Sequence, residues 1–271
     1  MIYKKKNNLI AFFKPRDKRK PFLKKRPPKT RLGKRFKDPF GDILPIKRAL
    51  ICLLGIVSYR RLNIVNRMNV VGMEHLKDLP KTNVLFVSNH QTYYADVIAL
   101  YHVFCSAKWG LSNINWPVYL LSPRVKSYYV AAEETMKDSG LLPSILSYTG
   151  AVTVKRSWRH KGQEVQRNAD RSAPSKIKTA MEYGWVINFP QGTTTKNAPV
   201  RKGSAKLIQA LNPIVVPVTI DGFRDAFGKK GLSFNKRGVQ LSVEFGEPIQ
   251  FGESATTEEV MAFLERHLIK E

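Results

Sequence analysis

Short apolar runs of strand length alternate with segments of helical periodicity along most of this chain. The run Asn83–Ser88 precedes Asp96–Phe104, where large apolar residues recur at helical spacing. Thr256 and Glu259, spaced as in a capping box, mark the start of the last helix. The same patterns predict strands over 128–131, 151–155, 185–189, 214–220 and 239–245, and helices over 175–183, 204–211 and 257–269. We therefore expect an α/β fold, a single domain with a mostly parallel central sheet flanked by helices.

The positive charge is concentrated at the start of the chain. The 271 residues contain 46 Lys and Arg against 21 Asp and Glu, which gives a net charge of +25, and residues 1–40 alone carry +14. Charges this dense, interleaved with prolines, predict a basic, disordered arm over residues 1–45. Such an arm can bind nucleic acid or anionic lipid, or it can remain a solvated tail.

An apolar segment follows this arm. Ala49–Tyr59 is uncharged and lies between the basic pairs Lys47-Arg48 and Arg60-Arg61. Eleven helical residues cover about 16 Å, roughly half the hydrocarbon core of a bilayer, so we expect no membrane-spanning helix. Residues 46–68 are interpreted as a short apolar helix that lies in a membrane interface, ahead of a catalytic domain over 69–271. A core helix with a solvated start is the alternative.

Two predicted strand ends carry reactive side chains. His90 directly follows the strand at 83–88, and Asp96 comes six residues later. A carboxylate that holds one ring nitrogen makes the other nitrogen a general base for a hydroxyl or an amine. A structural histidine that caps the following helix is the simpler alternative.

The second strand end is Phe189–Thr195, with the sequence FPQGTTT. Proline, glycine and three hydroxyl residues predict a tight turn with exposed donors. Arg201 and Lys202 follow at the start of a predicted helix, where cations and free backbone N–H groups make a candidate anion site. A polar turn without function is the alternative for this segment alone.

Together and in this order, these segments resemble the glycerolipid acyltransferase family, which includes the glycerol-3-phosphate and lysophosphatidate acyltransferases. The family's first block, an Asn-His-x-Ser segment followed by an Asp that four residues separate from the His, is similar to NHQTYYAD, with Thr92 at the hydroxyl position. Its second block is a short strand ending in arginine, matched by Gly150–Arg156. Its third, Phe-Pro-Glu-Gly-Thr-Arg-Ser, is matched by FPQGTTT, and its fourth, an apolar strand with a proline, by Ile214–Val218.

The sequence departs from the family pattern at three points. Five residues rather than four separate His90 from Asp96, Gln191 replaces the glutamate of the third block, and Thr194 replaces its arginine. The lost arginine removes a bidentate phosphate contact that a threonine cannot replace. The acceptor is therefore open between a phosphate-bearing lyso-lipid and one with an amine or amino-acid headgroup.

The resemblance implies an O-acyltransferase of phospholipid biosynthesis. It would move a fatty acyl group from acyl-CoA or acyl-carrier protein to the hydroxyl of a lysophospholipid such as 1-acylglycerol-3-phosphate, with His90 as general base and Asp96 as its partner. No enzyme nucleophile is required, because the attacking oxygen belongs to the substrate. No metal or cofactor is expected, since the other histidines show no Cys/His/Asp cluster at ligand spacing. The residues expected to bind the acceptor or its phosphate are Lys155, Arg156, Gln191, Gly192, Thr193, Thr194, Arg201 and Lys202.

These features together predict a peripheral or monotopic enzyme on the cytoplasmic face of a membrane. Its partners would be membrane lipids and the acyl donor, with no nucleic acid and no metal. Cys52 and Cys105 lie in apolar sequence, as is typical of reduced thiols in the cytosol. The charge leaves two other hypotheses open, a nucleic-acid-binding protein and a lipid-binding protein that keeps the fold without the chemistry.

Overall fold

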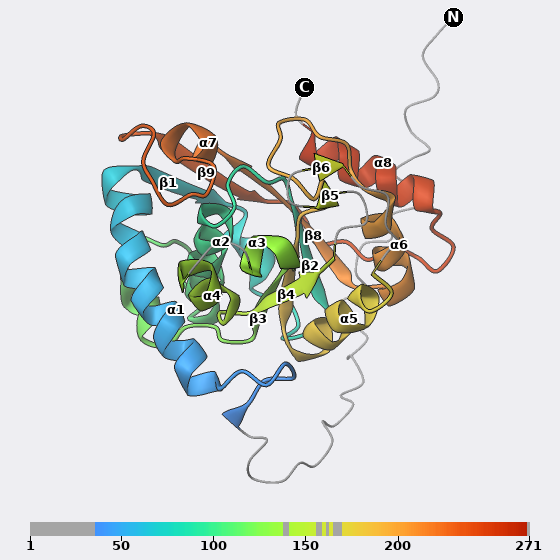
Figure 1. Cartoon of the computed structure of the whole chain (residues 1–271), viewed down its shortest axis with the longest axis horizontal. Coiled ribbons are helices and arrows are strands. Elements are labelled where there is room, and N and C mark those ends of the chain that lie inside the picture. The colour runs from blue at the N-terminus through green and yellow to red at the C-terminus, as the bar shows by residue number, and fades with distance from the viewer. Residues whose placement is uncertain (1–35, 138–140, 156–158, 161–162, 165–169, 270–271) are drawn as a thin grey trace, which may run out of the picture.

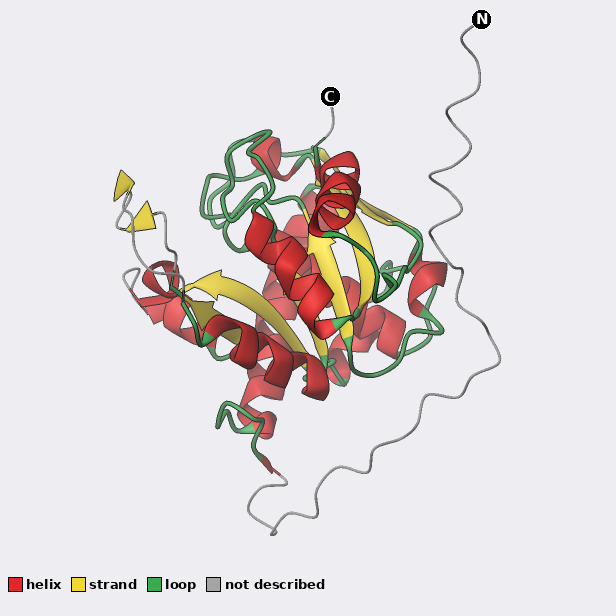
Figure 2. Cartoon of the chain, turned by 90° about the vertical axis from the view of Figure 1, so that its right-hand side faces the viewer, coloured by secondary structure: helices red, strands yellow, loops and turns green. Residues whose placement is uncertain are grey.

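A seven-stranded sheet is the centre of the computed structural model, which describes residues 36–137, 141–155, 159–160, 163–164 and 170–269. The strand order is β1-β9-β8-β2-β7-β3-β4, and every neighbouring pair is parallel except the antiparallel pair β8–β9 (Figure 1). The strands are β1 (Arg67–Val71), β2 (Val84–Ser88), β3 (Ser127–Ala132), β4 (Ala151–Val154), β7 (Trp185–Asn188), β8 (Ile214–Asp221) and β9 (Gln240–Phe245). The short strands β5 (Arg159–His160) and β6 (Gln163–Glu164) pair with each other, apart from this sheet (Figure 2).

Helices cover both faces of the sheet and create two apolar cores. In β2, Val84 and Phe86 point into the core under α1 and α2, whereas Leu85 and Val87 point into the core under α5, α6 and α8. Figure 1 shows these two helix layers on opposite sides of the strands. The longer helices are α1 (Leu44–Tyr59), α2 (Ala95–Lys108), α5 (Ala173–Tyr183), α6 (Lys202–Leu211) and α8 (Thr257–Leu268), and the shorter ones are α3 (Glu133–Lys137), α4 (Leu141–Ser147) and α7 (Phe223–Ala226).

The predicted fold class is confirmed. Because both faces of a parallel sheet are buried, its strands read as continuous apolar runs, and this is why they were visible in the sequence. The capping box is also present: Glu259 N donates to Thr256 Oγ1 at 3.2 Å, and Thr256 N donates to Glu259 Oε2 at 2.9 Å.

The end of the predicted basic arm belongs to the folded domain. Asp38 is buried and accepts a hydrogen bond from Lys47 Nζ at 3.4 Å, and this ammonium lies 4.0 Å from the centre of the Tyr128 ring. A buried ion pair holds both of its segments in place, so residues 36–45 are not part of a disordered arm, which corrects the boundary predicted at 45. The rest of the arm lies outside the described residues.

The predicted apolar helix has two faces. α1 buries Ile51, Gly55 and Ser58 against the core, while Leu53 and Val57 are more than 60% exposed. A π-helical turn, η3 (Arg60–Val65), continues it toward β1. None of the helices in the described residues combines the length and the apolar composition that crossing a bilayer requires.

Candidate active site

His90 and Asp96 meet at the carboxyl edge of the sheet. β2 ends at Ser88, α2 begins at Ala95, and the turn between them brings His90 Nδ1 to 2.8 Å from Asp96 Oδ2. The two side chains are therefore in contact despite the longer spacing, and their catalytic roles stay a prediction. Asp96 also accepts hydrogen bonds from the backbone N–H groups of Gln91 and Thr92 at 2.6 and 2.9 Å, and from Thr92 Oγ1 at 2.7 Å.

This arrangement sets the tautomer of His90. Since Asp96 is fully buried and acts as an acceptor, the proton of the neutral imidazole lies on Nδ1, and Nε2 keeps its lone pair. The His90 side chain is 14% exposed, which leaves an edge of the ring open to a substrate. A partly exposed imidazole fixed by a buried carboxylate is suited to take a proton from a hydroxyl.

The turn after β7 lies directly beside this pair. β7 is the parallel neighbour of β2, so the two strands end at the same edge of the sheet. The ring of Phe189 stacks on the imidazole of His90 with centroids 3.9 Å apart and planes 20° apart. Gly192 then takes a positive φ of 64°, and its N–H donates to Phe189 O at 2.9 Å, which closes the turn. The first and third blocks thus form one site.

The side chains of this turn point in different directions. Gln191 is buried, and its Nε2 donates to Ala198 O at 2.8 Å, while Thr194 is also buried. Both were expected to bind the acceptor; the Gln191 side chain is used within the loop, and contact of either residue with the acceptor stays a prediction. Gly192 and Thr193 are partly exposed, so they remain candidates for substrate contact.

The predicted basic residues are spread along the sheet edge. Arg201 and Lys202 are exposed at the start of α6, and Arg201 N donates to Pro190 O at 2.9 Å, which joins them to the third-block turn. Lys155 follows β4, three strands from β2, so it lies about 14 Å away along the sheet. Arg156 lies outside the described residues.

One part of the site was missed from the sequence: the end of β8 and the turn that follows it. Gln91 Nε2 donates to Ile220 O at 3.2 Å and to Asp221 Oδ1 at 3.1 Å, and Gln91 Oε1 accepts from Arg224 N at 3.1 Å. Asn89 makes two further hydrogen bonds to the backbone of Ile220. The position of this segment, directly after a predicted parallel strand, was the signal that could have identified it.

A loop over residues 227–238 supports the His90 turn from outside. Lys229 O and Lys230 O accept hydrogen bonds from Tyr93 N and Tyr94 N at 3.0 and 3.2 Å. Gly231 has a φ of 77°, and a Cβ at this position would lie 2.6 Å from Ala95 N. Only glycine fits this approach, so the loop fixes the start of α2 through backbone contacts.

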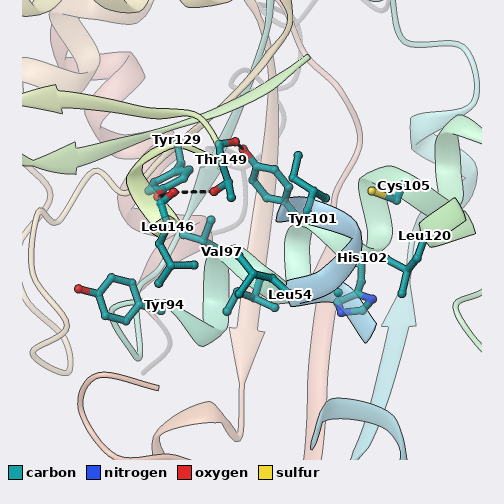
Figure 3. A pocket seen from close by; sticks show the side chains of 13 residues that line it. Leu54, Tyr94, Val97, Tyr101, His102, Cys105, Leu120, Tyr129, Leu146 and Thr149 are labelled. Carbon is teal, nitrogen blue, oxygen red and sulfur yellow. Dashed lines mark hydrogen bonds between the residues drawn. The ribbon is translucent and has the colours of Figure 1, made fainter. Parts of the chain in front are cut away.

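An apolar pocket lies beside the first turn of α2, the turn that contains Asp96. It lies between α1, α2, α4 and the 3-10 helix η5 (Pro117–Leu121). Figure 3 shows Tyr94 at one end of the pocket and His102 with Leu120 at the other. Its free volume is about 30 Å³, close to that of one water, so an alkyl chain must push the lining side chains apart to occupy it.

His102 forms a buried polar cluster at the far end of this pocket. Ser58 Oγ donates to Gly55 O at 3.1 Å, so it accepts from His102 Nε2 at 2.8 Å, and Tyr119 OH then donates to His102 Nδ1 at 3.0 Å. Burial lowers the pKa of His102 to about 4, so the ring is neutral at pH 7.

The buried His102 predicts a loss of stability in acid. Its pKa is lower in the folded chain than in the unfolded one, so the unfolded state binds more protons as pH falls from about 6.5 to about 4. We expect the free energy of unfolding to drop by about 3 kcal/mol over this range because of His102 alone. Urea denaturation of wild type and His102→Gln at pH 7 and pH 4.5 measures this, since the variant lacks the titrating group. An equal loss in both proteins would contradict the prediction.

Comparisons with known proteins agree with this geometry. A family model described as Acyltransferase matches residues 67–221, which is more than half of the chain. The fold is similar to that of the 1-acyl-sn-glycerophosphate (LPA) acyltransferase PlsC from Thermotoga maritima, with a TM-score of 0.53 and 20% identity over 81% of this chain and 75% of that one. Among curated proteins, none matches significantly. The chain belongs to the acyltransferase family, as its four sequence blocks predicted.

Proposed function

We propose that this enzyme transfers a fatty acyl group from a thioester, acyl-CoA or acyl-carrier protein, to the hydroxyl of a lysophospholipid such as 1-acylglycerol-3-phosphate. The observation that carries the proposal is the His90–Asp96 pair, 2.8 Å apart and stacked on Phe189, at the open edge of the sheet. The apolar pocket beside the first turn of α2 supplies a place for a lipid tail. The family assignment supplies the reaction class.

In this mechanism His90 Nε2 removes the proton of the acceptor hydroxyl as its oxygen attacks the thioester carbonyl. The tetrahedral intermediate then expels the thiolate, which takes the proton back from the imidazolium. Asp96 stabilises that imidazolium, and the exposed backbone around Gly192 and Thr193 is placed to donate to the oxyanion or to the acceptor. Burial raises the pKa of Cys105 to about 11, so its thiol stays protonated and is no nucleophile.

The acyl chain occupies the pocket between α1 and α2. Val97 lines this pocket and directly follows Asp96 in the sequence, so a chain in the pocket presents its carbonyl end near His90. The lining is almost wholly apolar, as a hydrocarbon tail requires. Leu54 and Leu146 are among the side chains that move to make room.

The enzyme acts as a peripheral protein on the cytoplasmic face of a membrane. α1 packs against η5, and the two elements present neighbouring exposed apolar side chains, among them Val57 and Leu121. Arg48 of α1 and Arg60 of η3 are exposed, and they can meet anionic headgroups. The charge of residues 1–35 adds to this attraction.

Replacing two exposed apolar residues with acids is expected to weaken membrane binding. Val57→Glu with Leu121→Glu removes apolar contact and adds repulsion, so binding to vesicles with anionic lipid should fall about tenfold or more in a flotation assay. The matched control is Ala210→Glu with Ala262→Glu, which makes the same charge change at exposed positions of the opposite helix layer. If both double variants lose vesicle binding equally, the loss comes from the added negative charge, and the proposed apolar contact with the membrane is contradicted. Deleting residues 1–61 is less suitable, because it removes the buried Ile51.

Lipid mass spectrometry tests the proposed reaction. Purified enzyme receives palmitoyl-CoA or palmitoyl-carrier protein together with a set of lyso-lipids that differ in headgroup. Acylated glycerophosphate supports the main proposal, and restored growth of a host that lacks its own lysophosphatidate acyltransferase supports it independently. An acylated lipid with an amino-acid headgroup supports the alternative acceptor instead. This alternative remains because Thr194 stands where the family has an arginine. No acylated lipid under any condition would refute the proposal.

A further inference from the structure

Arg224 supplies a guanidinium to the third-block turn, where the sequence lacks the family's arginine. The residue at that position is Thr194, whose side chain is buried. Its carbonyl oxygen accepts a hydrogen bond from Arg224 Nη2 at 2.8 Å. The turn after β7 thus receives a guanidinium from the segment after β8, 30 residues later in the chain.

The same residue is also fixed to the first block. Arg224 N donates to the side chain of Gln91, the residue next to His90, at 3.1 Å. Arg224 therefore connects the turn that carries the proposed base with the turn that follows β7. Of the residues expected to bind phosphate, Lys155 lies three strands from β2, and Arg201 and Lys202 are exposed on α6.

The charge of Arg224 has no carboxylate partner in the part of the chain that the structure describes. The ion pairs found there are Lys47–Asp38 and His90–Asp96. The nearby Asp221 accepts from Gln91 Nε2 at 3.1 Å. A guanidinium has five N–H donors, and the hydrogen bond to Thr194 O uses one of them. Arg224 is partly buried, so an anion that binds it is held more strongly than one at the exposed Arg201 or Lys202.

We propose that Arg224 binds the phosphate of the acceptor and makes the enzyme selective for phosphate-bearing lyso-lipids. This inference rests on the proposed function and narrows its acceptor. A phosphate could also come from the CoA part of the donor, so the experiment must separate the two sources.

Steady-state kinetics of wild type, Arg224→Gln and Arg224→Lys tests the role. The acceptors are 1-hexanoylglycerol-3-phosphate and the neutral 1-hexanoylglycerol, and the donor is palmitoyl-CoA. Loss of a charge-assisted phosphate contact should raise KM for the phosphate acceptor about 10- to 100-fold in Arg224→Gln. KM for palmitoyl-CoA and turnover of the neutral acceptor should stay within twofold, and Arg224→Lys should restore part of the loss. Arg266→Gln, an exposed arginine of α8, is the matched control.

Three results would overturn the inference. If Arg224→Gln leaves KM for the phosphate acceptor unchanged, Arg224 does not contact the phosphate. If only KM for palmitoyl-CoA rises, Arg224 contacts the donor instead. If activity falls equally with both acceptors, the role of Arg224 is structural. Direct binding of 1-hexanoylglycerol-3-phosphate, measured by calorimetry on wild type and Arg224→Gln, judges the contact without turnover. Equal affinities would refute the inference, whereas a wild type that binds but acylates nothing would refute the proposed reaction instead.

Discussion

Replacing His90 with alanine is expected to lower kcat about 10²- to 10⁴-fold, the usual contribution of a general base. Its Nε2 lies on the side of the ring opposite the hydrogen bond to Asp96, so the substitution removes the proposed proton acceptor. Folding should be little affected, because the ring is partly exposed and Asp96 keeps three other hydrogen-bond donors. Thermal unfolding and acyl-transfer assays on the same preparation measure both effects.

His75→Ala provides the matched control for this experiment. His75 is partly exposed in the 3-10 helix η4 (Met73–Leu76), away from the carboxyl edge of β2, so its loss should leave kcat unchanged. A His90→Ala protein that keeps wild-type turnover would contradict the mechanism. If wild type shows no turnover, and wild type and His90→Ala bind lysophospholipid with the same affinity, the function is lipid binding.

Asp96→Ala is expected to damage both activity and stability. Its two oxygens accept four hydrogen bonds, including those from the N–H groups of Gln91 and Thr92, and the side chain is fully buried. Removing it leaves buried donors without partners, which we expect to cost about 3–5 kcal/mol of folding free energy. kcat should fall as well, because the imidazole loses its orientation and the imidazolium loses its partner.

Comparison of the two variants separates catalysis from structure. Urea denaturation should give a much lower midpoint for Asp96→Ala than for His90→Ala, while both lose activity. Asp96→Asn keeps the volume but places an amide donor against donor groups, so its stability should fall between wild type and Asp96→Ala. If Asp96→Ala unfolds at the wild-type midpoint, the carboxylate does not hold the turn together.

The sheet was predictable because most of its strands are buried on both faces. β2 and β8 read as uninterrupted apolar runs, and each of them was identified. β1 was not, because only Met68 of its five residues is buried and its stability comes from pairing with β9, about 170 residues away. Residues 36–45 were assigned to the basic arm for a similar reason: Asp38 is held by Lys47 and Tyr128, and no local pattern records such contacts.

The contact between His90 and Asp96 was also predictable, but the loops that pack around it were not. A histidine and an aspartate directly after an apolar strand identified the pair, since short spacings constrain where side chains lie. Gln191 and Thr194 were assigned to substrate by position, and their burial depends on loop packing, which no local pattern records. The loop over 227–238 acts through the carbonyls of Lys229 and Lys230, and backbone contacts leave no residue signature except the glycine at 231.

The two faces of α1 have a consequence for how a lipid tail travels. Its inner face, at Ile51 and Gly55, forms a wall of the apolar pocket, and its outer face, at Val57, is the proposed contact with the bilayer. A lipid tail that passes between α1 and α2 would move from the apolar interior of the bilayer into the apolar pocket without contact with water. Each methylene kept out of water in this way avoids a penalty of about 0.8 kcal/mol. Long-chain substrates would then load directly from the leaflet, and the enzyme would sense their density within the membrane rather than their trace amounts in solution.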